Sequence, residues 1–495
     1  MNAKQENLKR LLSPRHIALI GGREMAGAVR NCEALGYEGE IRVVNPKREE
    51  ISGQKCYPSV ADLPEAPDAA FVGVRRELAV EVVRELAERG AGGCVCYAAG
   101  FAELGPEGEA LQKELVAAAG AMALVGPNCY GLLNYLDGAA LWPDLHGGER
   151  VERGVAIVSQ SGNVSLNVTM ADRSLPLTHV ISIGNQAVLG IGDYVEALIK
   201  DRKVEAIGMY VEGIDDVPGF GRAAIAALKK GVPLVALKSG TSRLGSRITL
   251  SHTDSLSHPD ELYTALFERL GVVRVDSVPA LLETLKLLAI SGPLEGRKLG
   301  VLAASGGDSA MFADLASPAG LKMPQFDEDQ TAALRDQLGG FASVSNPLDY
   351  NTAVWGDRAE LERCFATVME GDFDATLLTL DYPRPGTGDK DPWDAAADGL
   401  IAARERTGKR AVVLSNVPEL LPREARERLL AGGVAPLQGL REAVTALRGA
   451  AWYGEKRREV LAEGAPENLV PVSPGREPAS PRFLDEWESK RLLAA

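Results

Sequence analysis

Short apolar runs alternate with longer amphipathic stretches along most of this chain. The apolar runs in the first third cover residues 16–21, 41–45, 69–74, 93–98 and 122–126. The stretches between them carry Ala, Leu and Glu at helical spacing. Near-continuous apolar strands that alternate with such helices predict a parallel sheet covered by helices on both faces.

The same alternation recurs twice more. A second series of apolar runs follows a polar stretch, and a third series follows residues 292–298. The second series covers 155–159, 179–183, 206–211 and 233–238, and the third covers 299–303, 375–380 and 411–414. We therefore predict an α/β protein with three doubly wound parallel-sheet domains. The expected domain limits are 10–140, 150–293 and 297–455.

The C-terminal residues have a different composition. Residues 460–482 are rich in Pro, Glu and Ser, which is typical of an extended linker. Residues 483–495 form a single amphipathic helical pattern that is too short to be a domain. We expect this segment to be the opening helix of a further domain or a docking arm.

Composition and charge narrow the class of protein. Of the 495 residues, 45 % are apolar and 25 % are charged, which is globular composition. The net charge of −14 argues against a partner that is a nucleic acid or an anionic membrane. No apolar run reaches membrane-spanning length, and the N-terminus lacks a signal-like apolar core. The six cysteines show no disulfide framework, so we expect a cytoplasmic protein.

The first predicted domain carries features of a nucleotide site. Gly21, Gly22 and Arg23 follow the first strand, where glycine lets the backbone approach a phosphate at a helix N-terminus. Lys47 follows the second strand, where NAD-binding domains usually carry an acid. A cation there suits the additional phosphate of NADP or coenzyme A. A tight turn and a solvated lysine are the structural alternatives.

One histidine, His252, has small hydroxyl neighbours that keep an imidazole accessible. Two loops place Ser and Gly where a strand meets a helix N-terminus, the usual anion-binding position in α/β sheets. One is Ser161-Gly162 and the other is Ser305-Gly306-Gly307. Two such helix ends aimed at one imidazole would stabilise a phosphohistidine. Each loop by itself is equally consistent with a plain turn, and a single His is more often structural.

Several motifs then occur in the order of one family. They are Gly126-Pro127-Asn128-Cys129-Tyr130-Gly131, Val158-Ser159-Gln160-Ser161-Gly162, Tyr210-Val211-Glu212-Gly213, Lys238-Ser239-Gly240, Ser251-His252-Thr253, Ser305-Gly306-Gly307 and the run from Ala342 to Asp349. Together they resemble the NDP-forming acyl-CoA synthetases, the superfamily of ADP-forming acetyl-CoA synthetase and succinyl-CoA synthetase. The resemblance spans residues 10–455.

This resemblance implies a fold and a reaction. The first domain would be a CoA-binding Rossmann-like domain, and the other two would be flavodoxin-like domains of the succinyl-CoA synthetase type. The enzyme would join a carboxylic acid to CoA while ATP becomes ADP and phosphate, through acyl-phosphate and phosphohistidine intermediates. His252 would carry the phosphoryl group, and Glu212 would hold its other ring nitrogen.

The resemblance also implies the remaining site residues. The two Ser–Gly loops would cradle the phosphate, and no metal site is expected in this chain. The acid substrate would lie near Gly184 and Asn185. The expected CoA contacts are Gly21, Gly22, Arg23, Lys47, Val74, Arg75, Ala99, Gly100, Asn128 and Cys129.

Some positions depart from the family pattern. Asp254 stands where Gly is usual, Arg75 stands where Pro is common, and Gln186 and Val188 replace residues that are usually charged. These differences suggest an acid other than acetate or succinate. Trp355 and Trp393 could belong to a site for a bulkier or cationic acid, with buried packing as the alternative.

The family binds its nucleotide, ATP with Mg²⁺, on an ATP-grasp domain. The three predicted domains leave no room for one, so we expect it outside these 495 residues, as a further domain or a partner subunit. Residues 483–495 resemble its first helix. We also expect an oligomer. The alternatives are a CoA-binding regulatory protein without ligase activity and, less favoured, an NADP-dependent oxidoreductase.

Overall fold

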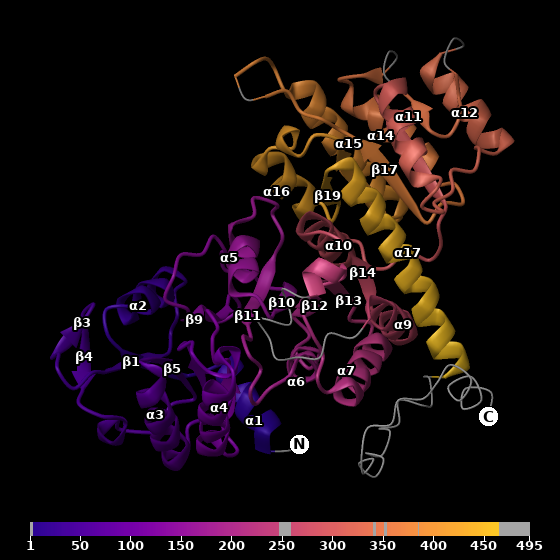
Figure 1. Ribbon diagram of the computed structural model, residues 1–495. Helices are drawn as coiled ribbons and strands as arrows, with labels where there is room; N and C mark the ends of the chain where they lie inside the picture. The colour runs from indigo at the N-terminus through magenta and orange to yellow at the C-terminus, as the bar shows by residue number, and fades with distance from the viewer. Residues whose placement is uncertain (1–2, 247–258, 340–342, 351–353, 385, 465–495) are drawn as a thin grey trace, which may run out of the picture.

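The computed structural model describes residues 3–246, 259–339, 343–350, 354–384 and 386–464, and it contains three sheets (Figure 1). The first sheet lies at one end of the molecule and the third at the other, with the second between them. None of the helices in these ranges is long and apolar enough to cross a membrane. The prediction of three mostly parallel α/β domains is confirmed.

The first sheet has the strand order β3-β4-β2-β1-β5-β6-β7. Its central strands are parallel, and the β3-β4 pair at its edge is antiparallel. The five predicted strands are all present, whereas the short, partly exposed β3-β4 hairpin was not predicted. The elements are α1 (Ala3–Leu12), β1 (His16–Gly21), α2 (Met25–Ala34), β2 (Glu40–Val44), β3 (Glu50–Ile51), β4 (Gln54–Tyr57), η1 (Val60–Asp62), β5 (Ala69–Gly73), α3 (Arg76–Arg89), β6 (Gly93–Cys96), η2 (Ala102–Leu104), α4 (Pro106–Ala119) and β7 (Ala123–Val125).

The second sheet has the order β14-β13-β12-β10-β11-β8-β9. Strand β8 pairs antiparallel with β11, so the chain joins the second sheet before residue 140, the expected end of the first domain. The reason is that the short apolar runs around residue 135 fold back as an edge hairpin. The elements are β8 (Gly131–Asn134), β9 (Ala139–Leu141), β10 (Gly154–Ser159), α5 (Gly162–Met170), β11 (Leu177–Ser182), α6 (Ile191–Leu198), β12 (Val204–Val211), α7 (Val217–Lys230), β13 (Leu234–Lys238), α9 (Asp260–Leu270), β14 (Val273–Val275) and α10 (Val278–Ile290).

The third sheet has the order β16-β15-β17-β18-β19 and is parallel throughout. Its last helix, α17, returns along the second domain and packs on α10 (Figure 1). Because α17 ends at Glu463, residues 460–463 are helical rather than part of a linker. The rest of the predicted linker and the segment 483–495 lie outside the described residues. The elements are β15 (Leu299–Ala303), α11 (Gly306–Ala316), α12 (Glu328–Leu338), β16 (Leu348–Asp349), α14 (Arg358–Met369), β17 (Ala375–Thr379), α15 (Asp391–Thr407), β18 (Ala411–Ser415), η3 (Pro418–Leu420), α16 (Arg423–Ala431), β19 (Ala435–Gln438) and α17 (Leu440–Glu463).

Buried charges join the second and third domains. Glu283 and Lys286 lie on α10, and both side chains are fully buried. Lys286 Nζ donates to Glu283 Oε2 at 2.8 Å and to the carbonyl of Pro436 at 2.9 Å. Arg173 Nη1 donates to Glu283 Oε1 at 3.0 Å and to the carbonyl of Gln438 at 2.8 Å. The two cations therefore tie α10 to the carbonyls of β19.

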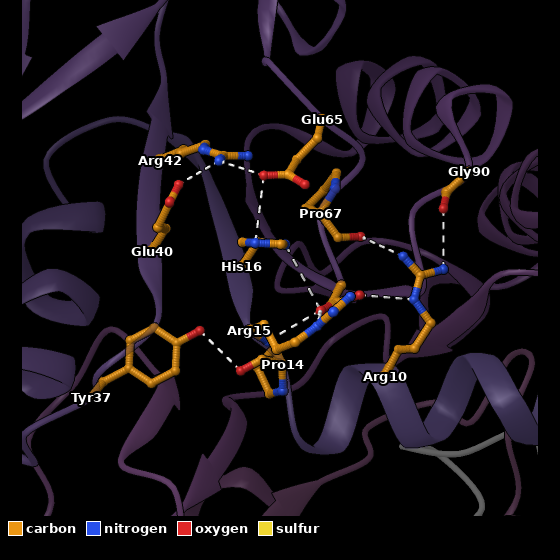
Figure 2. A network of polar contacts seen from close by, with 11 residues as sticks. Arg10, Pro14, Arg15, His16, Tyr37, Glu40, Arg42, Glu65, Pro67 and Gly90 are labelled. Carbon is orange, nitrogen blue, oxygen red and sulfur yellow. Dashed lines mark hydrogen bonds and ion pairs between the residues drawn. The ribbon is translucent and has the colours of Figure 1, made fainter.

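A second polar network closes the amino end of the first sheet (Figure 2). Its buried member is Asp68, whose carboxylate accepts from Arg10 Nε at 2.9 Å, from Arg15 Nε at 3.1 Å and from the Arg15 backbone N–H at 3.1 Å. Burial would raise the pKa of Asp68, but the hydrogen bonds from Arg10 and Arg15 outweigh it and hold that pKa below its usual value.

Replacing Asp68 with Asn is expected to lower the free energy of unfolding at pH 7 by about 1.5 kcal/mol. The Asn side chain is neutral and has one acceptor oxygen for the two arginines, and solvent screens the exposed arginine. A depressed folded-state pKa adds stability above the unfolded pKa, about 3.9, and this stability is lost as the pH falls through the folded-state pKa. The difference between native chain and variant should therefore narrow below about pH 4. Urea denaturation at both pH values measures it, with the exposed-site variant Glu81→Gln as control. An equal difference in the free energy of unfolding at pH 7 and below about pH 4 would contradict the lowered pKa of Asp68.

Candidate functional site

A cavity of about 690 Å³ lies where the carboxyl ends of β10, β11, β12 and β13 meet loops of the first domain. Carboxyl ends of parallel strands share one edge of a sheet, so residues far apart in sequence converge there. Eight predicted site residues line this cavity. They are Ala99, Asn128, Cys129, Ser161, Gly162, Gly184, Asn185 and Glu212.

The start of α5 forms one wall of the cavity. Ser161 caps this helix, and its hydroxyl accepts from the Val164 N–H at 3.3 Å. A Cβ atom at Gly162 would lie 2.2 Å from Cδ2 of Tyr130, so only glycine allows the ring to approach the helix this closely. The other N–H groups of the first turn lie at the positive end of the helix dipole. This wall is therefore suited to a phosphate.

Glu212 follows β12 and faces the same cavity. Its backbone is held by Gln160, a buried residue that the sequence analysis did not select. Gln160 Oε1 accepts from the backbone N–H of Glu212 and, at 3.0 Å, from that of Gly213, while Nε2 donates to the Gly213 carbonyl at 2.8 Å. One amide side chain thus fixes the turn that carries the carboxylate.

A buried cation lies behind this wall. Lys238 ends β13 and pairs in register with Val211, the residue before Glu212. Its ammonium lies 4.6 Å from the centre of the Tyr263 ring, and burial lowers the pKa of this lysine. The next residues, Ser239 and Gly240, line the cavity. His252 and Asp254 lie outside the described residues, so the position predicted to carry the phosphoryl group is not placed.

The first domain contributes the opposite wall. Cys129 lines the cavity, but burial raises the pKa of its thiol well above the usual value, which argues against a thiolate there. Three tyrosines also line the cavity, Tyr97, Tyr130 and Tyr210, and none of them was predicted as a site residue. Tyr130 is held by its backbone N–H, which donates to Ser182 Oγ at 3.1 Å. The cavity therefore has aromatic as well as polar walls.

Asn185 joins the two domains. Its Nδ2 donates to Glu103 Oε2 at 2.5 Å and to Gln112 Oε1 at 3.1 Å, and its Oδ1 accepts from Asn128 Nδ2 at 3.3 Å. Burial would raise the pKa of Glu103, but hydrogen bonds from Asn185 and the Gly100 N–H outweigh it and hold that pKa below its usual value. Both ends of the Asn185 amide are therefore occupied by first-domain side chains.

The predicted nucleotide contacts gather at the carboxyl edge of the first sheet. Gly21 ends β1 beside Gly73 of β5, and a Cβ atom at Gly21 would lie 2.7 Å from the Gly73 carbonyl oxygen. Asn45 links this loop to Lys47, because its Nδ2 donates to the Gly21 carbonyl at 2.7 Å and its Oδ1 accepts from the Lys47 N–H at 2.9 Å. The Gly22 N–H instead donates to Glu24 Oε1 at 3.1 Å. Among the described residues, Gly21, Gly22, Arg23, Lys47, Val74, Arg75 and Gly100 do not line the 690 Å³ cavity.

The second predicted phosphate loop lies elsewhere. Ser305 caps α11, and its hydroxyl accepts from the Gly307 N–H at 3.2 Å. Within the described ranges, Ser305, Gly306 and Gly307 line no part of the 690 Å³ cavity. Asp308 follows in the first turn, and burial together with the carboxylates of Asp381 and Asp349 raises its pKa. The phosphate-binding role of this loop stays a prediction.

Trp355 and Trp393 belong to the core of the third domain. Their rings pack edge to face with centres 5.2 Å apart, and both lie partly buried against that core. Packing therefore accounts for both tryptophans. In the part of the chain that the structure describes, no group of three His, Cys, Asp or Glu side chains could hold a metal ion.

Two family models match this chain. A CoA binding domain matches residues 15–135, and a succinyl-CoA ligase like flavodoxin domain matches residues 152–288. These matches cover the two domains whose loops form the cavity.

Three curated relatives are similar over most of the chain. A trans-feruloyl-CoA synthase from an unknown prokaryotic organism is 35% identical over 70% of this chain and 50% of its own length. The ADP-forming acetate–CoA ligase I of Archaeoglobus fulgidus is 32% identical over 82% of this chain and 58% of its own length. The alpha subunit of ADP-forming acetate–CoA ligase II of Pyrococcus furiosus is 32% identical over 70% of this chain and 76% of its own length. The chain thus spans between 50% and 58% of the length of the first two relatives.

A solved structure is similar along nearly the whole chain. It is the apo form of the dinucleotide forming acetyl-coenzyme A synthetase 1 of Candidatus Korarchaeum cryptofilum. The TM-score is 0.80 at 25% identity, and the match covers 92% of this chain and 99% of the other.

Proposed function

This chain belongs to the family of ADP-forming acyl-CoA synthetases, and we propose that it joins a carboxylic acid to coenzyme A while ATP becomes ADP and phosphate. The observation that carries the proposal is the shared cavity, which collects the α5 helix start, Glu212 and loops of the CoA-binding domain. This arrangement argues against a purely regulatory CoA-binding protein. Such a protein does not need the Glu212 carboxylate beside a helix start that is suited to a phosphate.

The proposed chemistry follows from the weakness of a carboxylate as an electrophile. Phosphohistidine at His252 transfers its phosphoryl group to the acid, which gives an acyl phosphate and free imidazole. The CoA thiol then attacks the acyl carbon, and inorganic phosphate leaves as the acyl-CoA forms. Glu212 would hold the second ring nitrogen of His252, and the N–H groups around Ser161 and Gly162 would bind the phosphoryl oxygens.

We place CoA at the carboxyl edge of the first sheet. Gly21 and Gly73 approach each other closely at this edge, and Lys47 is joined to the same edge through Asn45. From there the pantetheine arm would reach the cavity past Ala99 and Asn128, which line it. The thiol would then meet the acyl phosphate at the start of α5.

Lys47→Ala and Arg23→Ala are each expected to weaken CoA binding by about tenfold, because each removes a cation from a phosphate contact. Isothermal titration of CoA into the 495-residue chain measures this. Lys229→Ala, an exposed lysine on α7, serves as the matched control. Affinity equal to that of the native chain in both variants would remove these residues from the site.

We propose that ATP and Mg²⁺ bind an ATP-grasp domain outside these 495 residues, as a further domain or a separate subunit. A relative named as an alpha subunit supports a partner that completes the enzyme. The family's reaction needs this domain only for the ATP step. The half-reaction from acyl-CoA and phosphate to a phosphorylated chain should therefore proceed without it.

We infer that the acid is larger than acetate. The three tyrosines in the cavity wall provide flat apolar surface, and the relative at 35% identity is named for a feruloyl group. Feruloyl-CoA is therefore expected to support the half-reaction better than acetyl-CoA does.

A further inference from the structure

Glu103 lies on η2, outside the cavity, yet its carboxylate contacts both of the domains that form the cavity. Its Oε1 accepts from the Gly100 N–H at 2.6 Å, and its Oε2 accepts from Asn185 Nδ2 at 2.5 Å. Gly100 belongs to the first domain, and Asn185 belongs to the second. One carboxylate therefore bridges a loop predicted to contact CoA and a loop predicted to contact the acid.

The Gly100 peptide is held at its other end as well. Arg76 Nη1 donates to the Gly100 carbonyl at 2.7 Å, so a cation fixes the C=O while Glu103 fixes the N–H. This loop is also joined to Asn128, whose backbone N–H donates to the Ala98 carbonyl at 2.9 Å. The position of the loop thus depends on two charged side chains, Arg76 and Glu103, which each hydrogen-bond to Gly100.

Asn185 depends on the same contacts. Its backbone N–H donates to the Pro127 carbonyl at 2.9 Å, and its side chain meets Glu103, Gln112 and Asn128, all from the first domain. Asn185 is therefore placed in the cavity by the first domain rather than by its own strand. A movement of the Gly100 loop would be transmitted to Asn185 through the two oxygens of Glu103.

We propose that Glu103 is a positioning residue that couples the CoA loop around Gly100 to the acid-side residue Asn185. The proposal rests on the proposed function for the identity of the two ligands, whereas the coupling itself is a property of the contacts. It makes CoA affinity depend on a second-domain side chain through a carboxylate that lies outside the cavity.

The test is a double-mutant cycle with Glu103→Gln, Asn185→Ala and the double variant. The glutamine side chain has an N–H₂ group in place of one carboxylate oxygen, so it can accept from only one of the two donors, the Gly100 N–H and Asn185 Nδ2. Each single variant is expected to raise the CoA dissociation constant about three- to tenfold. The CoA dissociation constant of the double variant should not exceed that of the single variant with the larger effect, because both changes break the same link. Glu107→Gln, an exposed glutamate on α4, is the control.

Hydrogen–deuterium exchange of the peptide that contains Gly100 gives a second readout without any ligand. Faster exchange in Asn185→Ala, equal to that in Glu103→Gln, is the expected result. If exchange accelerates but neither the variants nor the native chain bind CoA, the coupling stands and the proposed function fails. The coupling is overturned if CoA binds and the increases in dissociation constant of the two single variants multiply in the double variant. It is also overturned if neither the dissociation constant nor the exchange rate changes. A purely structural role would lower thermal stability with unchanged CoA affinity, and this too would overturn it.

Discussion

Glu212→Gln is expected to slow phosphorylation of the chain by about ten- to a hundredfold. A neutral amide cannot stabilise the positive charge that an imidazole ring develops as it takes a phosphoryl group, and loss of such a charge-assisted hydrogen bond costs about 1.5–3 kcal/mol. The substitution keeps the backbone N–H that donates to Gln160, so the turn after β12 should hold its shape. The rate is measured with radiolabelled inorganic phosphate and feruloyl-CoA or acetyl-CoA.

The control for this experiment is Glu268→Gln, an exposed glutamate on α9. It should label at the rate of the native chain. A merely structural Glu212 predicts a different pattern, in which the melting temperature falls while the labelling rate of the folded protein stays the same. That pattern would remove Glu212 from the proposed mechanism.

Lys286→Met is expected to lower the free energy of unfolding by about 3–5 kcal/mol, since it takes a cation from the fully buried Glu283. It also leaves the Pro436 carbonyl of β19 without its donor. Because these contacts join the second and third domains, we expect the third domain to unfold earlier and separately. Calorimetric unfolding of Lys286→Met should show two transitions, and that of the native chain should show one more cooperative transition.

A companion variant tests the cause of this loss. Glu283→Gln combined with Lys286→Met removes both charges, and it should recover part of the stability because no buried charge of this pair then lacks its partner. The exposed-site variant Lys322→Met is the control. A loss below about 1 kcal/mol for Lys286→Met, or a double variant less stable than the single, would contradict the role given to this pair.

The fold could be predicted where burial gives a plain pattern. Strands β1, β10 and β15 are covered on both faces, so they appear as continuous apolar runs. Edge elements lack this signal. Strand β19 lies at the edge of its sheet and contains Pro436, which in isolation argues against a strand. The last turn of α17 also gave no helical signal, since it leads directly into residues that resemble a linker.

Some residues of the candidate site could be predicted from the sequence, and others could not. Ser161 was found because it follows a strand, and strand ends converge in a parallel sheet. Glu212 and Asn185 were expected from the family resemblance. Gln160 and Glu103 were missed because their roles depend on contacts between distant segments, such as the 82 residues that separate Glu103 from Asn185. The position of Gln160 inside Val158-Ser159-Gln160-Ser161-Gly162 was the one signal that could have drawn attention to it. For Glu103 the sequence offers no comparable sign.

We propose that this chain carries a phosphoryl group on His252, and this proposal is tested by locating that group. The native chain and His252→Ala are incubated with radiolabelled phosphate and feruloyl-CoA or acetyl-CoA, and the labelled peptide is identified by mass spectrometry. We expect an acid-labile, base-stable label on His252, as for an N–P bond, and we expect no label in His252→Ala. A native chain that takes up no label, or a label on Ser251, Ser255 or His258 that persists in His252→Ala, would contradict it.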